Sequence, residues 1–273
     1  MIFDNIQCQL GEGPLWHPER QELFWFDILS KRLHSAKRQW QFPTFVSAAG
    51  WIDRKTLMIA SAEALSSFDI GTAETTPICA LEADNPKTRS NDGRADPQGG
   101  FWIGTMGVNA QADAGAIYRY YRGELRQLFA PITISNAICF APDGKTAYFT
   151  DTPTQQIMRV ALDADGWPVG DPVVHIDLQG TDFRPDGAVV DTKGNLFSAQ
   201  WGAGQIAVYA PDAHFIKAFA FPAAQTTCPA FGGPDLSMLH CTSAAVGRDG
   251  ADDGKTFAIQ TEYTGQAEHR VIL

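Results

Sequence analysis

Four residues with side-chain oxygen atoms stand at corresponding places in a repeated pattern along the chain. They are Glu12, Asn91, Asn136 and Asp186, and each is followed six residues later by a turn residue and then by a short apolar run. Two carboxylates and two amides form a donor set that suits hard divalent ions such as Ca²⁺, Mg²⁺ or Mn²⁺, and also Zn²⁺ or Fe²⁺ if water completes the shell. A fold that brings these side chains together would create an oxygen-lined cation site.

The pattern recurs six times when two weaker copies, at Ala48 and Cys228, are included. Successive anchor residues, as we term these six positions, are 36, 43, 45, 50 and 42 residues apart, and each interval holds three or four short apolar runs. A period near forty with about four strands is typical of a β-propeller blade. We therefore predict an all-β, six-bladed β-propeller that forms a single domain over residues 1–273, with residues 2–8 completing the last blade. The first strand of each blade then lines the central channel and places the metal site there.

Other interpretations of the repeat remain open. A pair of β-sandwiches or a solenoid would make the spacing a coincidence of turn chemistry, although strand-sized runs dominate and no apolar stripe has the helical period. Taken singly, Asn136 and Asp186 are typical of turn residues that bond to nearby backbone amides. Glu12 argues against this interpretation, because glutamate is not a favoured turn residue.

Composition narrows the classes of partner. With 21 Lys and Arg against 31 Asp and Glu, the net charge is −10, and no basic cluster suits nucleic acid. No apolar run approaches the length of a membrane span, and the first residues lack the pattern of a signal peptide. The five cysteines are scattered, which favours reduced thiols. We expect a cytoplasmic protein that binds neither nucleic acid nor membrane, and no feature indicates its oligomeric state.

Five motifs resemble those of the gluconolactonase/regucalcin (senescence marker protein) family. In chain order they are LGEGPLW (10–16), RSNDG (89–93), SN (135–136), PDG (185–187) and CPAFGG (228–233). Together they cover essentially the whole chain, which makes the resemblance far more specific than a lone motif. It implies a six-bladed propeller that holds one divalent cation in its channel and hydrolyses a sugar lactone to the aldonic acid.

The resemblance also implies roles for individual residues. The family's metal ligands correspond to Glu12, Asn136 and Asp186, and its substrate-contacting arginine and asparagine to Arg89 and Asn91.

The adjacent channel acid corresponds to Asp92. The resemblance departs at Asn109, which stands where animal members carry an acid that contacts the substrate, so recognition of the distal sugar hydroxyls is left open.

Lactone opening fits these residue types on chemical grounds. The reaction needs a polarised carbonyl, an activated water and a stabilised oxyanion, and a bound cation supports all three. A carboxylate then takes the proton as the water attacks. Asp186 is the first candidate for this base; Asp92 is the second, because a ligand carboxylate is a weaker base than a free one. Arg89 and Asn91 would hold ring or hydroxyl oxygens of the substrate.

Functions of other classes stay open. A non-catalytic, calcium-binding regulatory propeller and an interaction scaffold are both compatible with the repeat, although a scaffold gives no reason for the polar anchor residues to converge. No G-x-S-x-G motif indicates a serine hydrolase, and no glycine-rich motif indicates a nucleotide cofactor. Trp201 is either a wall of the pocket or a packing residue.

Overall fold

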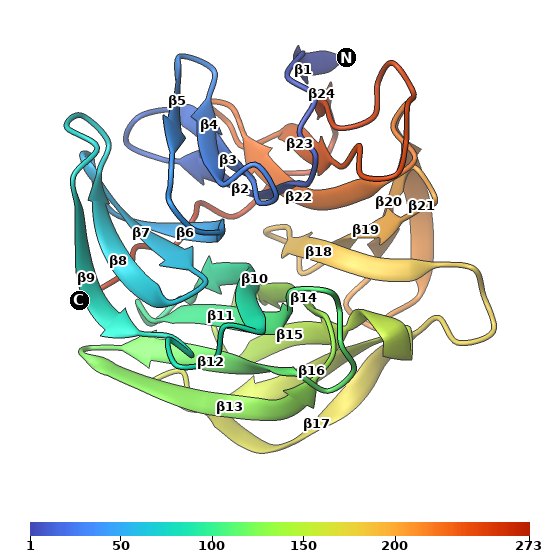
Figure 1. The fold of residues 1–273 in the computed structure, drawn as a ribbon. Coiled ribbons are helices and arrows are strands. Elements are labelled where there is room, and N and C mark those ends of the chain that lie inside the picture. The colour runs from blue at the N-terminus through green and yellow to red at the C-terminus, as the bar shows by residue number, and fades with distance from the viewer.

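The computed structural model describes residues 1–273 and has six four-stranded antiparallel sheets arranged around a central axis (Figure 1). Its one helical element is the 3₁₀ turn η1 (Thr152–Thr154). No helix in the structure has the length and apolar character needed to cross a bilayer. The prediction of an all-β, six-bladed propeller is thus confirmed, and the sandwich pair and the solenoid are excluded.

Each of the first five blades places its strands in chain order, with the first strand innermost. Blade 1 consists of β2 (Gly11–His17), β3 (Glu22–Asp27), β4 (Arg32–Ser35) and β5 (Arg38–Gln41). Blade 2 consists of β6 (Val46–Asp53), β7 (Thr56–Ser61), β8 (Ala64–Asp69) and β9 (Thr75–Ala80). Blade 3 consists of β10 (Thr88–Ala95), β11 (Phe101–Gly107), β12 (Gly115–Tyr121) and β13 (Glu124–Ile132). Blade 4 consists of β14 (Ser135–Phe140), β15 (Thr146–Asp151), β16 (Gln156–Leu162) and β17 (Pro168–Asp177). Blade 5 consists of β18 (Arg184–Val190), β19 (Leu196–Trp201), β20 (Gln205–Tyr209) and β21 (Phe215–Ala220). Blade 6 consists of β22 (Thr226–Gly232), β23 (Met238–Ser243), β24 (Thr256–Gln260) and β1 (Ile2–Asp4).

The ring is closed by the N-terminal strand. β1 pairs antiparallel with β24, so that Ile2 lies opposite Phe257 and blade 6 gains its fourth strand. The segment predicted to complete the last blade therefore does so, although its strand ends at Asp4 instead of reaching Cys8. This pairing covers the edge of β24 and leaves the short strand β1 as the outer edge of blade 6.

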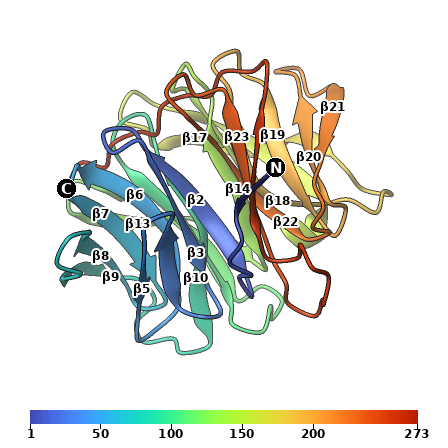
Figure 2. The same ribbon diagram turned by 90° about the horizontal axis from the view of Figure 1, so that it is seen from above.

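The C-terminal segment, residues 264–272, is termed the strap. It crosses the channel at the end where the inner strands β14 and β18 finish. The amide nitrogen of Gln266 donates to the carbonyls of Phe140 and Val190, both at 3.0 Å, where β14 and β18 end. Farther along, the backbone nitrogen of Val271 donates to the Trp51 carbonyl of blade 2 at 2.9 Å. The C-terminus accordingly lies beside blade 2 (Figures 1 and 2).

All six inner strands are irregular at the anchor residue. The register between the first and second strands shifts at or directly beside each of the six anchor positions. A bulge breaks the regular alternation of side chains and re-aims the residue that it contains. Two of the residues that follow anchors, Gly13 and Ala137, have positive φ angles of 52° and 55°. The irregularity therefore turns side chains toward the channel without ending the strand.

Apolar side chains fill the spaces between neighbouring blades. Six clusters occur, one at each junction around the ring. Trp25 and Trp102 are fully buried within them. Burial of a large apolar side chain stabilises a fold by roughly 1.5–3 kcal/mol. These junctions make the ring a rigid frame for the channel.

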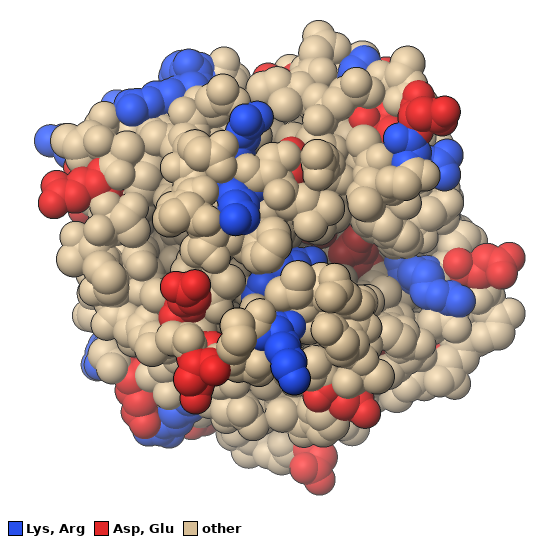
Figure 3. Space-filling view, viewed as in Figure 1, with Lys and Arg blue, Asp and Glu red and all other residues tan.

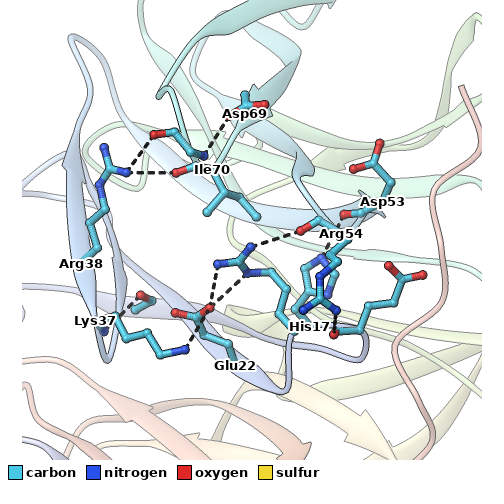
Figure 4. A network of polar contacts seen from close by, with 12 residues as sticks. His17, Glu22, Lys37, Arg38, Asp53, Arg54, Asp69 and Ile70 are labelled. Carbon is cyan, nitrogen blue, oxygen red and sulfur yellow. Dashed lines mark hydrogen bonds and ion pairs between the residues drawn. The ribbon is translucent and has the colours of Figure 1, made fainter.

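A polar network also joins blades 1 and 2, at the β2–β3 and β6–β7 turns and at the outer strands (Figure 4). Arg20 donates to the carboxylate of Glu22 at 3.1 Å and to the carbonyl of Arg54 at 3.2 Å. Arg38 donates across the junction to the Gly71 carbonyl at 3.0 Å. These contacts fasten the two blades and involve none of the anchor residues.

Candidate functional site

A cavity of about 180 Å³ lies at the end of the channel where the inner strands begin. Its polar lining comes from blades 1, 3, 4 and 5 and consists of Glu12, Arg89, Asn91, Asn136, Thr152 and Asp186. Its apolar lining consists of Leu10, Met106, Ile134 and Trp201. The face in Figure 3 is hollowed near its middle, where acidic and basic atoms lie below the rim. Five of the seven residues proposed from the sequence thus line one cavity.

The other two proposed residues lie outside this cavity. Asp92 is buried, and its Oδ2 accepts a hydrogen bond from the backbone nitrogen of Ile138 at 2.7 Å. Asn109 is exposed on the loop after β11, where its backbone nitrogen donates to Oε1 of Gln111 at 3.0 Å. Their roles as base and as substrate contact stay predictions.

The two anchor positions without a side-chain oxygen fill the channel. Cys228 packs directly against Gly187, where even a Cβ atom would collide with its Sγ. Ala48 packs in the same way against Gly93, with its Cβ 3.3 Å from the place that a Cβ would occupy there. These contacts need small residues on both sides, so the ring of six anchors combines four polar positions with two packing positions.

A chain of hydrogen bonds connects the polar lining across three blades. Arg89 Nη1 donates to Asn91 Oδ1 at 2.8 Å, and Asn91 Nδ2 donates to Asn136 Oδ1 at 3.1 Å. Asn136 Nδ2 in turn donates to Thr152 Oγ1 at 2.9 Å, and this hydroxyl donates to the carbonyl of Pro185 at 2.8 Å. These hydrogen bonds hold the side-chain amides of Asn91 and Asn136 in defined orientations.

Two buried carboxylates dominate the electrostatics of the cavity. Glu12 and Asp186 are each only 5% exposed, and burial raises the pKa of both. The charge of Glu12 raises the pKa of Asp186 further, and Asp92 acts in the same direction on both groups. Arg89 offsets this in part, although burial lowers its own pKa to about 10. A site with such repulsion between carboxylates favours a bound cation.

The donor set fits a divalent cation that prefers oxygen ligands. Glu12 and Asp186 supply carboxylates, and Asn136 supplies an amide oxygen from the facing strand. Nowhere in the structure do three His, Cys, Asp or Glu side chains form a group suited to a metal ion. The candidate metal centre therefore depends on the mixture of two carboxylates with an amide.

Leu10, Met106, Ile134 and Thr152 were missed from the sequence, although a regular spacing marks the apolar walls. Trp201, left open between a wall of the pocket and a packing residue, is a wall of the cavity. The residues fifteen positions after the four polar anchors are Asp27, Met106, Asp151 and Trp201. Met106 and Trp201 are themselves walls of the cavity. Asp27 accepts a hydrogen bond from the backbone of Leu10 at 3.1 Å, and Asp151 accepts one from that of Ile134 at 2.8 Å. Asp27 and Asp151 thus hold the remaining two walls, Leu10 and Ile134, in place.

Comparison with known proteins places this geometry in a family. The model of the SMP-30/Gluconolactonase/LRE-like region matches residues 10–245. The crystal structure of a calcium-binding protein, regucalcin, from Agrobacterium tumefaciens has a TM-score of 0.97 and 40% identity, covering 100% of this chain and 97% of that one. An L-arabinolactonase of Azospirillum brasilense is 33% identical over 286 residues, which span 98% of this chain and 94% of the relative. The pentonolactonase XacC of Haloferax volcanii is 31% identical over 282 residues, with 97% and 96% covered. The chain belongs to the SMP-30/gluconolactonase/LRE-like family.

Proposed function

We propose that this protein hydrolyses a sugar lactone to the aldonic acid with a divalent cation held by Glu12, Asn136 and Asp186. The observation that carries the proposal is the convergence of these three side chains, from three different blades, on one cavity. The lactonase names of two relatives support the class of reaction.

The identity of the cation is proposed from the donor chemistry. Oxygen-only ligands favour Ca²⁺, with Mg²⁺ and Mn²⁺ next and Zn²⁺ or Fe²⁺ as less favoured alternatives. The calcium-binding description of the regucalcin neighbour supports the same choice. When bound, such a cation supplies positive charge for the lactone carbonyl oxygen as it becomes an oxyanion. Glu12 and Asp186 must both be deprotonated to hold it.

Asp186 is our candidate for the general base. Its carboxylate lines the cavity, so an oxygen of this group can take the proton of the water that attacks the lactone carbonyl carbon. The ring C–O bond then breaks, and the ring oxygen gains a proton to become the hydroxyl of the aldonic acid. Asp92 is the second candidate; burial raises its pKa to about 6, but the Ile138 amide already occupies one of its oxygens.

Arg89 is proposed to hold the substrate. It lines the cavity, and only its Nη1 donates within the protein, to the Ser90 carbonyl and Asn91 Oδ1, which leaves Nη2 as a donor for a ring or hydroxyl oxygen. The Asn91 amide is bonded at both ends, so its main contribution is to hold Arg89 in place. Asn109, on the exposed loop, is proposed to contact the outer end of a longer substrate. We also propose a cytoplasmic location, in line with five unpaired cysteines.

The test is acid release from aldonolactones of five and six carbons, followed with a pH indicator in weak buffer. Chelator-treated protein should accelerate ring opening only after Ca²⁺ or another divalent ion is restored. Asp186→Asn should remove the acceleration, whereas Asp212→Asn, a change on the exposed surface, should retain it. Cation binding without turnover on any lactone would favour the regulatory alternative. Absence of both cation binding and turnover would leave only a scaffold.

A further inference from the structure

Thr152 joins the candidate ligand Asn136 to the strand that carries Asp186. Its hydroxyl accepts a hydrogen bond from Asn136 Nδ2 at 2.9 Å and donates one to the carbonyl of Pro185 at 2.8 Å. The residue is half-buried, lines the cavity and opens η1. Its two bonds therefore connect blades 4 and 5 at the level of the proposed cation.

The direction of every bond in this chain follows from its two ends. The carbonyl of Pro185 can only accept, so the proton of Thr152 points to it and the hydroxyl oxygen must accept from Asn136. At the other end, the guanidinium of Arg89 can only donate, so Asn91 presents its oxygen there and its nitrogen to Asn136. Both neighbours thus orient the Asn136 amide in the same way. Its nitrogen faces Thr152, and its oxygen keeps a lone pair for the cavity.

We propose that Thr152 is a positioning residue that holds the Asn136 oxygen ready for the cation. The inference rests on the proposed function and adds a residue to its machinery. An asparagine amide binds cations only through its oxygen, because its nitrogen has no free lone pair and carries two donor hydrogens. Without the Thr152 hydroxyl, the Asn136 nitrogen loses its hydrogen-bond acceptor. Only the hydrogen bond from Asn91 to the Asn136 oxygen then opposes rotation of the amide.

The test compares two substitutions at this position. Thr152→Val keeps the shape of the side chain and removes the hydroxyl, whereas Thr152→Ser keeps the hydroxyl and removes a methyl group. Chelator-treated wild type and variants are titrated with Ca²⁺ alone, and separately with Mn²⁺ alone, by isothermal titration calorimetry. Loss of a residue that orients a metal ligand typically weakens metal affinity 10–100-fold. We expect this loss in Thr152→Val and an affinity near that of wild type in Thr152→Ser.

A kinetic readout separates positioning from a general structural defect. Lactone hydrolysis by Thr152→Val should fall at low cation concentration and recover as the cation is raised, while thermal unfolding of the cation-free variants stays close to that of wild type. Equal cation affinity in wild type and Thr152→Val would overturn the inference and leave the proposed function intact, as would equal losses in the valine and serine variants. A wild type that binds no divalent cation and shows no lactone turnover would overturn both.

Discussion

We predict that His240 makes closure of the propeller ring sensitive to acid. It lies on β23 and is only 2% exposed. Its ring stacks on Trp16 of blade 1, with centroids 5.7 Å apart, and meets the edge of Phe3 on β1 at 4.9 Å. These three side chains pack together where the last blade joins the first. Burial lowers the pKa of His240 from its ordinary value of 6.5 to about 4.

The sign of the effect follows from which state binds the proton more readily. Between pH 6.5 and 4 the unfolded chain binds a proton at this histidine, whereas the folded protein keeps the imidazole neutral. The stability that the neutral ring contributes is therefore present above pH 6.5 and is lost as the pH falls toward 4. One pKa unit corresponds to about 1.4 kcal/mol, so the free energy of unfolding should decrease by about 3 kcal/mol over this interval.

Urea unfolding of wild type and His240→Leu at pH 7.5 and pH 4 measures this contribution. Subtraction of the two free energies of unfolding at each pH cancels the groups that the proteins share. We expect the difference to shift by about 3 kcal/mol between the two pH values, in favour of the variant in acid. His214→Leu, at an exposed position, controls for loss of a histidine as such. A difference between wild type and His240→Leu that is the same at both pH values would refute the reasoning.

The remaining predictions concern the cavity and the strap. Asp186→Asn should abolish lactone hydrolysis and weaken Ca²⁺ binding. The fold should be retained, because the change removes one of two buried carboxylates that repel each other. Activity, calorimetry and circular dichroism check these three results, and full turnover would contradict the assignment. Arg89→Ala should lower kcat/KM about 10–100-fold through lost charged hydrogen bonds. Its cation affinity should change little, because the Ser135 carbonyl, 2.9 Å from Asn91 Nδ2, still holds that amide; a large loss of Ca²⁺ binding in calorimetry would count against the assignment. Glu268→Gln should reduce the free energy of unfolding in urea by about 3–5 kcal/mol, because Arg94 would remain buried without its partner. Glu262→Gln, which breaks a surface pair with Lys217, is the matched control and should change stability little.

The repeat in the sequence was sufficient to predict the ring because it is encoded locally. Each blade has its own anchor residue, turn and apolar strand, and the inner position of the first strand follows from propeller geometry. For the same reason, the sequence placed Glu12, Asn136 and Asp186 at equivalent positions, and the structure brings them to one cavity. Repetition carries this information even though the three residues are far apart in the chain.

Features that depend on contacts between blades were not predictable in this way. Thr152 lies in the turn between β15 and β16, and its importance arises from one bond within blade 4 and one to blade 5. Asp92 is adjacent to a cavity residue, but the bulge in β10 directs it to the backbone of Ile138 instead. The strap has no counterpart elsewhere in the chain, so no periodic signal marks it. Side-chain direction at a bulge and long-range packing both require the folded backbone.

The strap also determines how molecules reach the centre of the ring. Gln266 and the ion pair between Glu268 and Arg94 lie across the end of the channel opposite the cavity. We expect the channel to be a well that opens only at the cavity end. In the proposed reaction the product acid must leave by the route through which the lactone entered, so a well that still contains product cannot admit the next substrate. We therefore expect the aldonic acid to inhibit competitively, because it occupies the same site as the lactone.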